Sequence, residues 1–441
     1  MVETPSRTIL AVVGIPVAAV VIAWLVIFVP PPGSAPSLST GPNVRVNLYA
    51  PGSDWAGGWG EDPEMAVAAN GTLFVVWWGV EALDSAADTS GLVPPNTTAV
   101  WLATSTDGGA EFSAPIRVSP SDQPYVFDPT VAVAASGGLT LAWVNESSAG
   151  SEEGLSVASA PAGSLSFAVR TLAEAPVVAR PWLVSLPDGS LALAYSNDTA
   201  TLWSVSIDLG ATFSPFAEIP GTGYATSATS DGPNLLLLAG LGPGATEGGT
   251  VPLWFAAVNT TTGTVQASAP GETYLEYPTE LAATNMSHPG PAIAVAGTTI
   301  YLAYDGENQS SIELVTSTDG GVGWSGAITV VSGVDRQYAM PDLLASPSGA
   351  RLALSWESDA SGYWDEYAVV ARTPVTSFSA VGLASSASGL PADVLNDHGS
   401  FTALAATNAT GFVLAWNDGR GVVDSDYASN VYACFVTTPF A

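Results

Sequence analysis

The chain has 441 residues, 47% of them hydrophobic, which is enough for a large core. It has 40 acidic residues against 9 basic ones, all arginine, so its formal net charge is −31. Nucleic acid is excluded as a partner, because so few bases cannot neutralise a row of phosphates. The single cysteine, Cys434, excludes an intrachain disulfide and is predicted to be a small buried side chain.

The first element in the chain is an apolar run at residues 8–29, which contains no charged residue. A helix of this length crosses the ~30 Å hydrocarbon core of a bilayer. Residues 1–7 are predicted to be a cytoplasmic tail, residues 8–29 a transmembrane anchor and residues 30–42 a Pro/Ser/Gly linker. A cleaved signal peptide is the alternative. The sequence therefore predicts a single-pass protein of the cell membrane, with residues 43–441 on the extracytoplasmic side.

Asn-x-Ser/Thr sequons fit that side of the membrane, because they are acceptors for N-glycosylation. Ser/Thr-rich loops that produce sequons by accident are the alternative. Each sequon is predicted to lie in a loop. The asparagines are Asn70, Asn96, Asn145, Asn197, Asn259, Asn285, Asn308 and Asn408.

An internal repeat organises the rest of the chain. Seven segments, each an apolar strand, a turn and a second apolar strand, lie at 61–77, 127–143, 179–195, 224–240, 290–304, 340–356 and 400–416. All but the fourth end in an aromatic residue: Trp77, Trp143, Tyr195, Tyr304, Trp356 and Trp416. A second strand pair follows each hairpin. The repeat predicts an all-β, seven-bladed β-propeller of four-stranded antiparallel blades, preceded by one N-terminal transmembrane helix.

The two ends of the repeat are expected to complete each other. The seventh unit stops after its third strand, at residues 431–438, whereas residues 42–51 resemble the outer strand of the first unit. We therefore expect the N-terminal strand to pair into the last blade and close the ring, which removes exposed sheet edges.

Three segments have the pattern Ser-x-Asp-x-Gly-x-x-aromatic, at 105–112, 206–213 and 317–324. On these Asp boxes and the repeat, residues 43–441 resemble the sialidase-like, BNR-repeat β-propellers. The resemblance implies that the boxes are structural and lie in the turn between the third and fourth strands. Their residues are Ser105, Asp107, Gly109, Phe112, Ser206, Asp208, Gly210, Phe213, Ser317, Asp319, Gly321 and Trp324.

The mouth of the propeller axis is the default site. Loops that lead into the first strand of each blade, or out of its second strand, share one face, and both sets are rich in polar residues. The second set is predicted to hold many acids, among them Glu81, Glu146, Asp305, Glu357 and Asp418. The candidate ligand-binding residues are Asp62, Asp128, Arg180, His288, His398 and Arg420.

The resemblance also implies a candidate catalytic function. Sialidases of this kind use three arginines, a Tyr/Glu nucleophile pair and an Asp acid, and place the first arginine in an Arg-Ile-Pro motif. Here that place reads Glu61-Asp62-Pro63, so the motif is absent. Arginines that pair with nearby carboxylates are the alternative reading. The residues that the resemblance implies are Arg180, Arg336, Arg420, Asp128, Glu276 and Tyr277.

No cofactor is required by these patterns. Calcium is an option at Asn417, Asp418, Asp424 and Asp426, whose oxygens are hard ligands without the regular spacing of a Ca²⁺ loop. A zinc site is not expected from two histidines and one cysteine.

The sequence therefore predicts a cell-surface binding or adhesion propeller that recognises glycans or cell-surface proteins through its upper loops. Aromatic residues there either stack on sugars or pack between blades: Trp55, Trp59, Trp78, Tyr363 and Trp364. The alternative is a sialidase-like exo-glycosidase that hydrolyses terminal acidic sugars.

Overall fold

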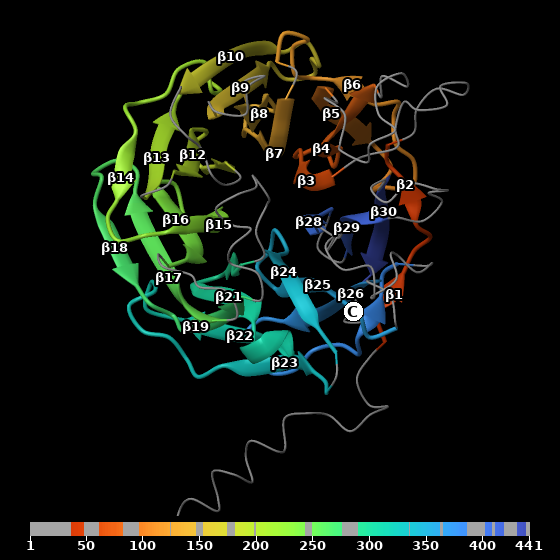
Figure 1. Ribbon diagram of the computed structural model, residues 1–441, viewed down its shortest axis with the longest axis vertical. Helices are drawn as coiled ribbons and strands as arrows, with labels where there is room; N and C mark the ends of the chain where they lie inside the picture. The colour runs from red at the N-terminus through yellow and green to blue at the C-terminus, as the bar shows by residue number, and fades with distance from the viewer. Residues whose placement is uncertain are drawn as a thin grey trace, which may run out of the picture.

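A computed structural model describes residues 37–47, 61–82, 97–123, 125–146, 153–173, 181–197, 200–242, 249–275, 290–334, 336–361, 365–385, 402–407, 411–418 and 430–437. They form seven antiparallel sheets arranged as a ring around a central axis (Figure 1). The predicted seven-bladed all-β propeller is confirmed. Within these ranges, the 3₁₀ turn η2 (Glu307–Gln309) is helical, and no helix is long and apolar enough to cross a membrane. The predicted anchor at 8–29 lies outside the described residues.

The blades follow one another along the chain, and each runs from an inner strand at the axis to an outer strand at the rim. Blades 1 and 2 contain β3 (Glu61–Val67), β4 (Leu73–Ala82), β5 (Thr97–Ser105) and β6 (Ile116–Arg117), then β7 (Tyr125–Val133), β8 (Leu139–Glu146), β9 (Glu153–Ala160) and β10 (Ala168–Ala173). Blade 3 contains β11 (Trp182–Ser185), β12 (Leu191–Ser196), β13 (Thr201–Ser206) and β14 (Ala217–Ile219). Blade 4 contains β15 (Tyr224–Ser230), β16 (Leu235–Leu241), β17 (Gly249–Asn259) and β18 (Val265–Ser268), and β19 (Glu272–Leu275) also pairs with β17.

The last three blades follow the same order. Blade 5 contains β20 (Ala292–Ala296), β21 (Thr299–Asp305), β22 (Ser311–Ser317) and β23 (Ile328–Ser332). Blade 6 contains β24 (Tyr338–Ala345), β25 (Arg351–Ser358), β26 (Asp365–Arg372) and β27 (Gly382–Leu383). Blade 7 contains β28 (Thr402–Ala406), β29 (Gly411–Asp418) and β30 (Asn430–Thr437), with β1 (Ser39–Thr40) and β2 (Val44–Arg45) as its outer strand.

The predicted ring closure is confirmed, since the N-terminal strands pair with the last strand of the chain. Ser39 lies opposite Thr437 and Val44 lies opposite Ala433, both in antiparallel register. The pairing starts at Ser39, a few residues before the expected strand. Val46, which is 0% exposed, continues it with a backbone hydrogen bond to the carbonyl of Val431 at 2.8 Å.

Adjacent blades pack through apolar side chains on both faces of each sheet. The hairpin-ending aromatic residues Trp77, Trp143, Trp356 and Trp416 are at most 1% exposed. Trp77 belongs to a cluster that joins blade 7 to blade 1, and Trp143 to one that joins blade 1 to blade 2. Burial of both faces explains why the second strands read as continuous apolar runs rather than as alternating ones.

Polar side chains join the inner strands where two blades meet near the axis. Backbone N–H groups of inner strands donate to side chains of the preceding blade, among them Leu183 to Thr130 Oγ1 at 3.4 Å, Ile293 to Ser227 Oγ at 3.1 Å and Leu404 to Asp342 Oδ2 at 2.7 Å. An inner strand has no neighbouring strand on its axial edge, so these side chains satisfy donors that strand pairing leaves open.

The three Asp boxes form the same turn after the third strand of blades 1, 3 and 5. In blade 1, the Asp107 carboxylate accepts hydrogen bonds from Ser105 Oγ and from the N–H groups of Ala110 and Glu111. Gly109 has φ +94°, which its missing Cβ permits. The aromatic residue packs against the preceding blade: Trp324 meets Phe255 edge-on with ring centroids 5.3 Å apart. In all three turns the Asp carboxylate therefore binds groups of its own turn.

The adjacent glycines of the blade 5 box provide a matched test of that packing. Gly320 and Gly321 have φ +76° and +88°, but an added Cβ at Gly320 meets nothing within 4 Å, whereas at Gly321 it lies 2.1 Å from Phe255. Both Gly→Ala changes strain the backbone, and only the second also overpacks the blade contact. We expect Gly321→Ala to lower the free energy of unfolding by about 2 kcal/mol more than Gly320→Ala, measured by urea denaturation. Equal losses would show that the box does not depend on this contact.

Candidate functional site

The upper face of the propeller is the end that holds the links between second and third strands and the links between blades. The lower face holds the Asp-box turns. Of the residues predicted to bind a ligand at the upper mouth of the axis, the structure describes Asp62 and Asp128, and of the further catalytic candidates it describes Arg336. The others lie outside the described residues: Arg180, Arg420, Glu276, Tyr277, His288 and His398.

Asp62 and Asp128 occupy equivalent, strained positions at the upper ends of their inner strands. Their φ values are +52° and +51°, and Met340 in blade 6 has +53°. Each of the three precedes a proline and lies in a register shift between the first two strands of its blade. A left-handed backbone is costly for residues other than glycine, and such strain concentrates at functional sites. The x-Pro step at these three positions is visible in the sequence, but the left-handed backbone before the proline was not predicted.

The two aspartates are buried near the upper ends of β3 and β7. Asp62 is 3% exposed and Asp128 is 1% exposed. Asp62 Oδ2 accepts a hydrogen bond from Trp78 Nε1 at 2.5 Å, and Trp78 meets Phe127 of blade 2 edge-on, with centroids 5.0 Å apart. A carboxylate and an indole thus lie together between blades 1 and 2. Their role toward a ligand stays a prediction.

Several acids that were predicted to lie in upper loops are instead parts of strands, so that prediction was wrong for them. Strand pairing continues beyond the apolar run, because main-chain hydrogen bonds do not require apolar side chains. Asp305 ends β21 and Glu357 lies inside β25, with exposed fractions of 2% and 0%. The others are Glu81 in β4, Glu146 at the end of β8 and Asp418 at the end of β29.

Asp305 is an unusually weak acid for an aspartate. It follows the buried aromatic Tyr304 and lies where blade 5 meets the strained Met340 of blade 6. Burial raises the pKa of Asp305 to about 8, although hydrogen bonds from the Gln309 side chain and the Met340 backbone act in the opposite direction. Asn417 occupies the same position in blade 7, after Trp416. Asp305 therefore keeps a proton near neutral pH and can donate a hydrogen bond.

A second group of buried acids lies in blade 6, on the side that packs against blade 7. Glu357 on β25 lies directly opposite Glu366 on β26, and both are 0% exposed. Burial raises the pKa of Glu366 well above its usual value, and the nearby charges of Glu357 and Asp342 add to this effect. Glu366 was missed from the sequence, because a single glutamate in a predicted strand gives no sign of which acid it will face.

Arg336 holds two upper segments of blade 6 together. Its Nη1 donates to the carbonyl of Ala360 at 2.8 Å, and the next residue, Gln337, donates its N–H to Asp359 Oδ1 at 2.7 Å. These bonds join the segment before β24 to the segment after β25. A catalytic group of Arg336, Arg180 and Arg420 beside a Tyr/Glu pair stays a prediction, since the other residues of that group lie outside the described ranges.

Metal binding was tested only in part. Among the described residues, no group of three or more His, Cys, Asp or Glu side chains could hold a metal ion. Of the predicted calcium segment, Asn417 and Asp418 are described, and Asp424 and Asp426 lie outside. Calcium therefore stays a prediction.

The described sequon asparagines differ in setting. Asn70 is exposed in the lower turn between β3 and β4, whereas Asn145 lies inside β8, so the expected loop position is wrong for Asn145. Asn145 Oδ1 accepts a hydrogen bond from Ser156 Oγ at 2.7 Å. Asn259 ends β17, Asn308 is in η2, and Asn197 follows β12. Asn96, Asn285 and Asn408 lie outside the described residues.

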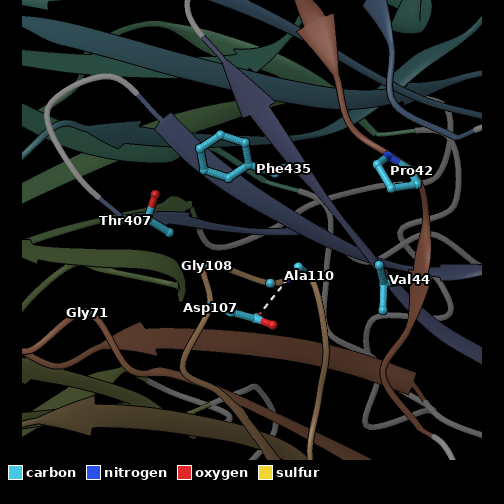
Figure 2. Close-up of a pocket in the computed structure, with 9 residues that line it drawn as sticks. Pro42, Val44, Gly71, Asp107, Gly108, Ala110, Thr407 and Phe435 are labelled. Carbon is cyan, nitrogen blue, oxygen red and sulfur yellow. Dashed lines mark hydrogen bonds between the residues drawn. The ribbon is translucent and has the colours of Figure 1, made fainter.

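A cavity of about 430 Å³ opens on the lower face between blades 7 and 1 (Figure 2). Its wall combines the closing segment at Pro42 and Val44, Phe435 of β30 and the blade 1 Asp box. Asp107 lies in this wall, with its Oδ1 accepting the hydrogen bond from Ala110 N at 3.0 Å. Hydrogen bonds from Ser105 and Glu111 lower the pKa of Asp107. The carboxylate is thus engaged in its own turn, and the cavity wall offers no pair of groups suited to acid–base chemistry.

Comparison with known proteins supports the fold. No family model matches the chain, and no curated protein matches it. A protein of unknown function from Dyadobacter fermentans aligns at 11% identity over 91% of this chain and 99% of its own, with a TM-score of 0.53. An α-L-arabinofuranosidase from Fusarium graminearum (16% identity, 76% and 98%, TM-score 0.48) and the NanB sialidase from Streptococcus pneumoniae (12%, 89% and 70%, TM-score 0.49) are more distant. At these identities the likeness is one of fold and does not extend to activity.

The raised pKa of Asp305 makes the stability of the protein depend on pH. Below about pH 4 both folded and unfolded states hold the proton. Above that, the unfolded state releases it and the folded state retains it until about pH 8, so stability is lost across this window. Asp305→Asn removes the titrating group. We expect the free energy of unfolding of the variant, relative to that of the natural chain, to rise by up to about 5 kcal/mol between pH 4 and pH 8, as measured by urea denaturation.

Asp107→Asn is the control, because its acid has the opposite shift. Hydrogen bonds lower the pKa of Asp107 in the folded state. The natural chain should therefore have a higher free energy of unfolding than this variant at neutral pH, and the difference should disappear in acid. If the difference in free energy of unfolding between Asp305→Asn and the natural chain does not change from pH 4 to 8, the raised pKa of Asp305 in the folded state is contradicted.

Proposed function

We propose that this chain is a cell-surface binding propeller that recognises neutral glycans, alone or on proteins, at the upper mouth of its axis. The observation that supports it most is the Asp62–Trp78 pair between blades 1 and 2, beside the equivalent Asp128. Binding sites commonly combine aromatic surface with a few fixed polar groups. The half-buried Trp78 indole would offer a flat face to the C–H side of a pyranose, and the buried Asp62 carboxylate holds that indole by accepting its Nε1 hydrogen bond.

The charge of the mouth favours neutral over acidic sugars. Carboxylates stand at the upper ends of β3 and β7, and the first arginine that an acidic-sugar hydrolase of this fold would use is replaced by Glu61-Asp62-Pro63. The whole chain has a formal net charge of −31. A ligand with its own carboxylate meets like charge on approach, which slows association and weakens binding.

Cell-surface attachment is the second part of the proposal. The apolar run at residues 8–29 would span the bilayer, and the preceding Arg7 favours a cytoplasmic N-terminus. The eight sequons are consistent with an extracytoplasmic propeller. The ligands would then be glycans or glycoproteins of the surroundings or of a neighbouring cell.

A glycoside hydrolase is the second candidate, favoured by the raised pKa of Asp305. Glycosidases pair an acid that stays protonated with an ionised carboxylate, and Asp305 has the first property. The outcome that would establish this reading is release of fluorophore from a panel of glycosides, sialosides included, by the full chain and its loss in Asp305→Asn.

The binding proposal predicts which substitution abolishes recognition on a glycan array. We expect Asp62→Ala in the full chain to weaken binding to neutral glycans about tenfold or more, because the Trp78 indole loses the hydrogen bond that holds it, and a hydrogen bond to a charged group contributes about 1.5–3 kcal/mol. Glu218→Gln, an exposed change on the rim strand β14, should bind as the natural chain does. Binding confined to sialylated glycans, or retained in full by a folded Asp62→Ala variant, would refute the proposal.

The extracytoplasmic location predicts selective use of the sequons. In a host that glycosylates asparagine, we expect peptide mass spectrometry of the folded chain to find glycan on exposed Asn70 and none on Asn145. The Asn145 amide lies in a paired strand and is engaged by Ser156, so a glycan there opposes folding of blade 2. Glycan on Asn145 in the folded protein, or its absence from every sequon, would count against this prediction.

A further inference from the structure

The direction of the closing strands fixes where the N-terminal segment leaves the propeller. β1 and β2 run antiparallel to β30, and Ser39 lies opposite Thr437, the last residue of that strand. Thr437 also lies opposite Gly411, which follows the lower turn between β28 and β29. Ser39 is therefore at the lower end of blade 7, and the chain rises from there toward Val46 opposite Val431.

We propose that the lower face of the propeller lies against the bilayer, so that the upper mouth points away from the membrane. The proposal rests on the membrane anchoring proposed above for residues 8–29. The surface is defined by the tips of the turns that link third and fourth strands, and its partner is the headgroup layer of a zwitterionic membrane. An anionic membrane is a poorer partner, because the chain has no lysine and an acidic net charge.

The short link between the apolar run and Ser39 keeps this face near the membrane. Residues 30–38 begin with three prolines and separate the two segments. Proline-rich chain extends at about 3.1 Å per residue, so the link spans roughly 30 Å at most. The lower edge of blade 7 therefore stays within that distance of the bilayer, on the side of the ring where the chain enters.

Several tips of the lower turns carry exposed aliphatic side chains, and the exposed acids beside two of them are hydrogen-bonded within their own turns. Ile207 is 87% exposed, Val322 66% and Leu165 44%, in blades 3, 5 and 2. Asp208 and Asp319, beside Ile207 and Val322, accept hydrogen bonds from their own turns, as from Thr212 N at 2.7 Å and Gly323 N at 2.9 Å. Exposed aliphatic side chains at protruding tips suit the boundary between headgroups and acyl chains. Exposed Glu111 on the same face is compatible with a zwitterionic surface.

The chain offers a matched pair of labelling positions on its two faces. Ile207 on the lower face and Val334 on the upper face are aliphatic residues exposed to 87% and 86%. The native Cys434 is 1% exposed, so an introduced cysteine can be labelled selectively in the folded chain. Ile207→Cys and Val334→Cys, each with a thiol-reactive fluorophore, differ in face and not in exposure.

The experiment measures quenching of each label in the full chain, reconstituted into phosphatidylcholine vesicles that contain a headgroup spin-labelled phosphatidylcholine. We expect the quenching of the label at position 207 to be at least about twice that of the label at position 334. Equal quenching, or stronger quenching at 334, overturns the proposed orientation. Vesicle flotation separates the two levels of failure: a chain that does not float with the vesicles refutes the anchoring and the orientation, whereas one that floats without differential quenching refutes the orientation alone.

Discussion

The pairing of β1 and β2 with β30 is the constraint on which the remaining structure depends. Each blade covers the faces of its neighbours, so a ring that failed to close would leave β30 with an open edge and expose the cluster between blades 7 and 1. Val46 from the N-terminal segment packs there with Trp77 and Val431. The described part of the chain contains no disulfide, and its cysteine, Cys434, is buried. Packing and strand pairing alone hold the two ends together.

Closure also explains why polar side chains gather around the axis. Inner strands lack a partner on their axial side, and the side chains of Thr130, Ser227 and Asp342 satisfy N–H groups of the next blade. Thr130 and Asp342 each lie two residues after a strained position, Asp128 and Met340 respectively. The contacts that join these blades near the axis therefore involve residues next to the strained positions.

The repeat allowed the fold to be predicted, because its signal is local and is repeated seven times. Hairpins that end in Trp77, Trp143, Trp356 and Trp416 place a large buried side chain at one position of the blade contact, and a sequence pattern reveals that directly. The site could be predicted only in outline. The left-handed backbone at Asp62 depends on the bulge between two strands, and the pKa of Asp305 depends on blade 6 covering it. Both are tertiary effects, which propensity and spacing do not encode.

The two faces use their acids in opposite ways, and this separates structure from function. On the lower face, Asp107 and Asp319 are exposed carboxylates whose pKa values are lowered by hydrogen bonds within their turns, so their charge is stabilised and serves the fold. At the upper end of blades 5 and 6, burial raises the pKa values of Asp305 and Glu366, which costs stability at neutral pH and contributes nothing that a neutral side chain could not. In blade 7 the position of Asp305 is occupied by Asn417, which has no charged form whose burial would lower stability. The buried acids at the upper ends of blades 5 and 6 are therefore consistent with the proposal that recognition occurs at the upper face, because perturbed pKa values cluster at functional sites.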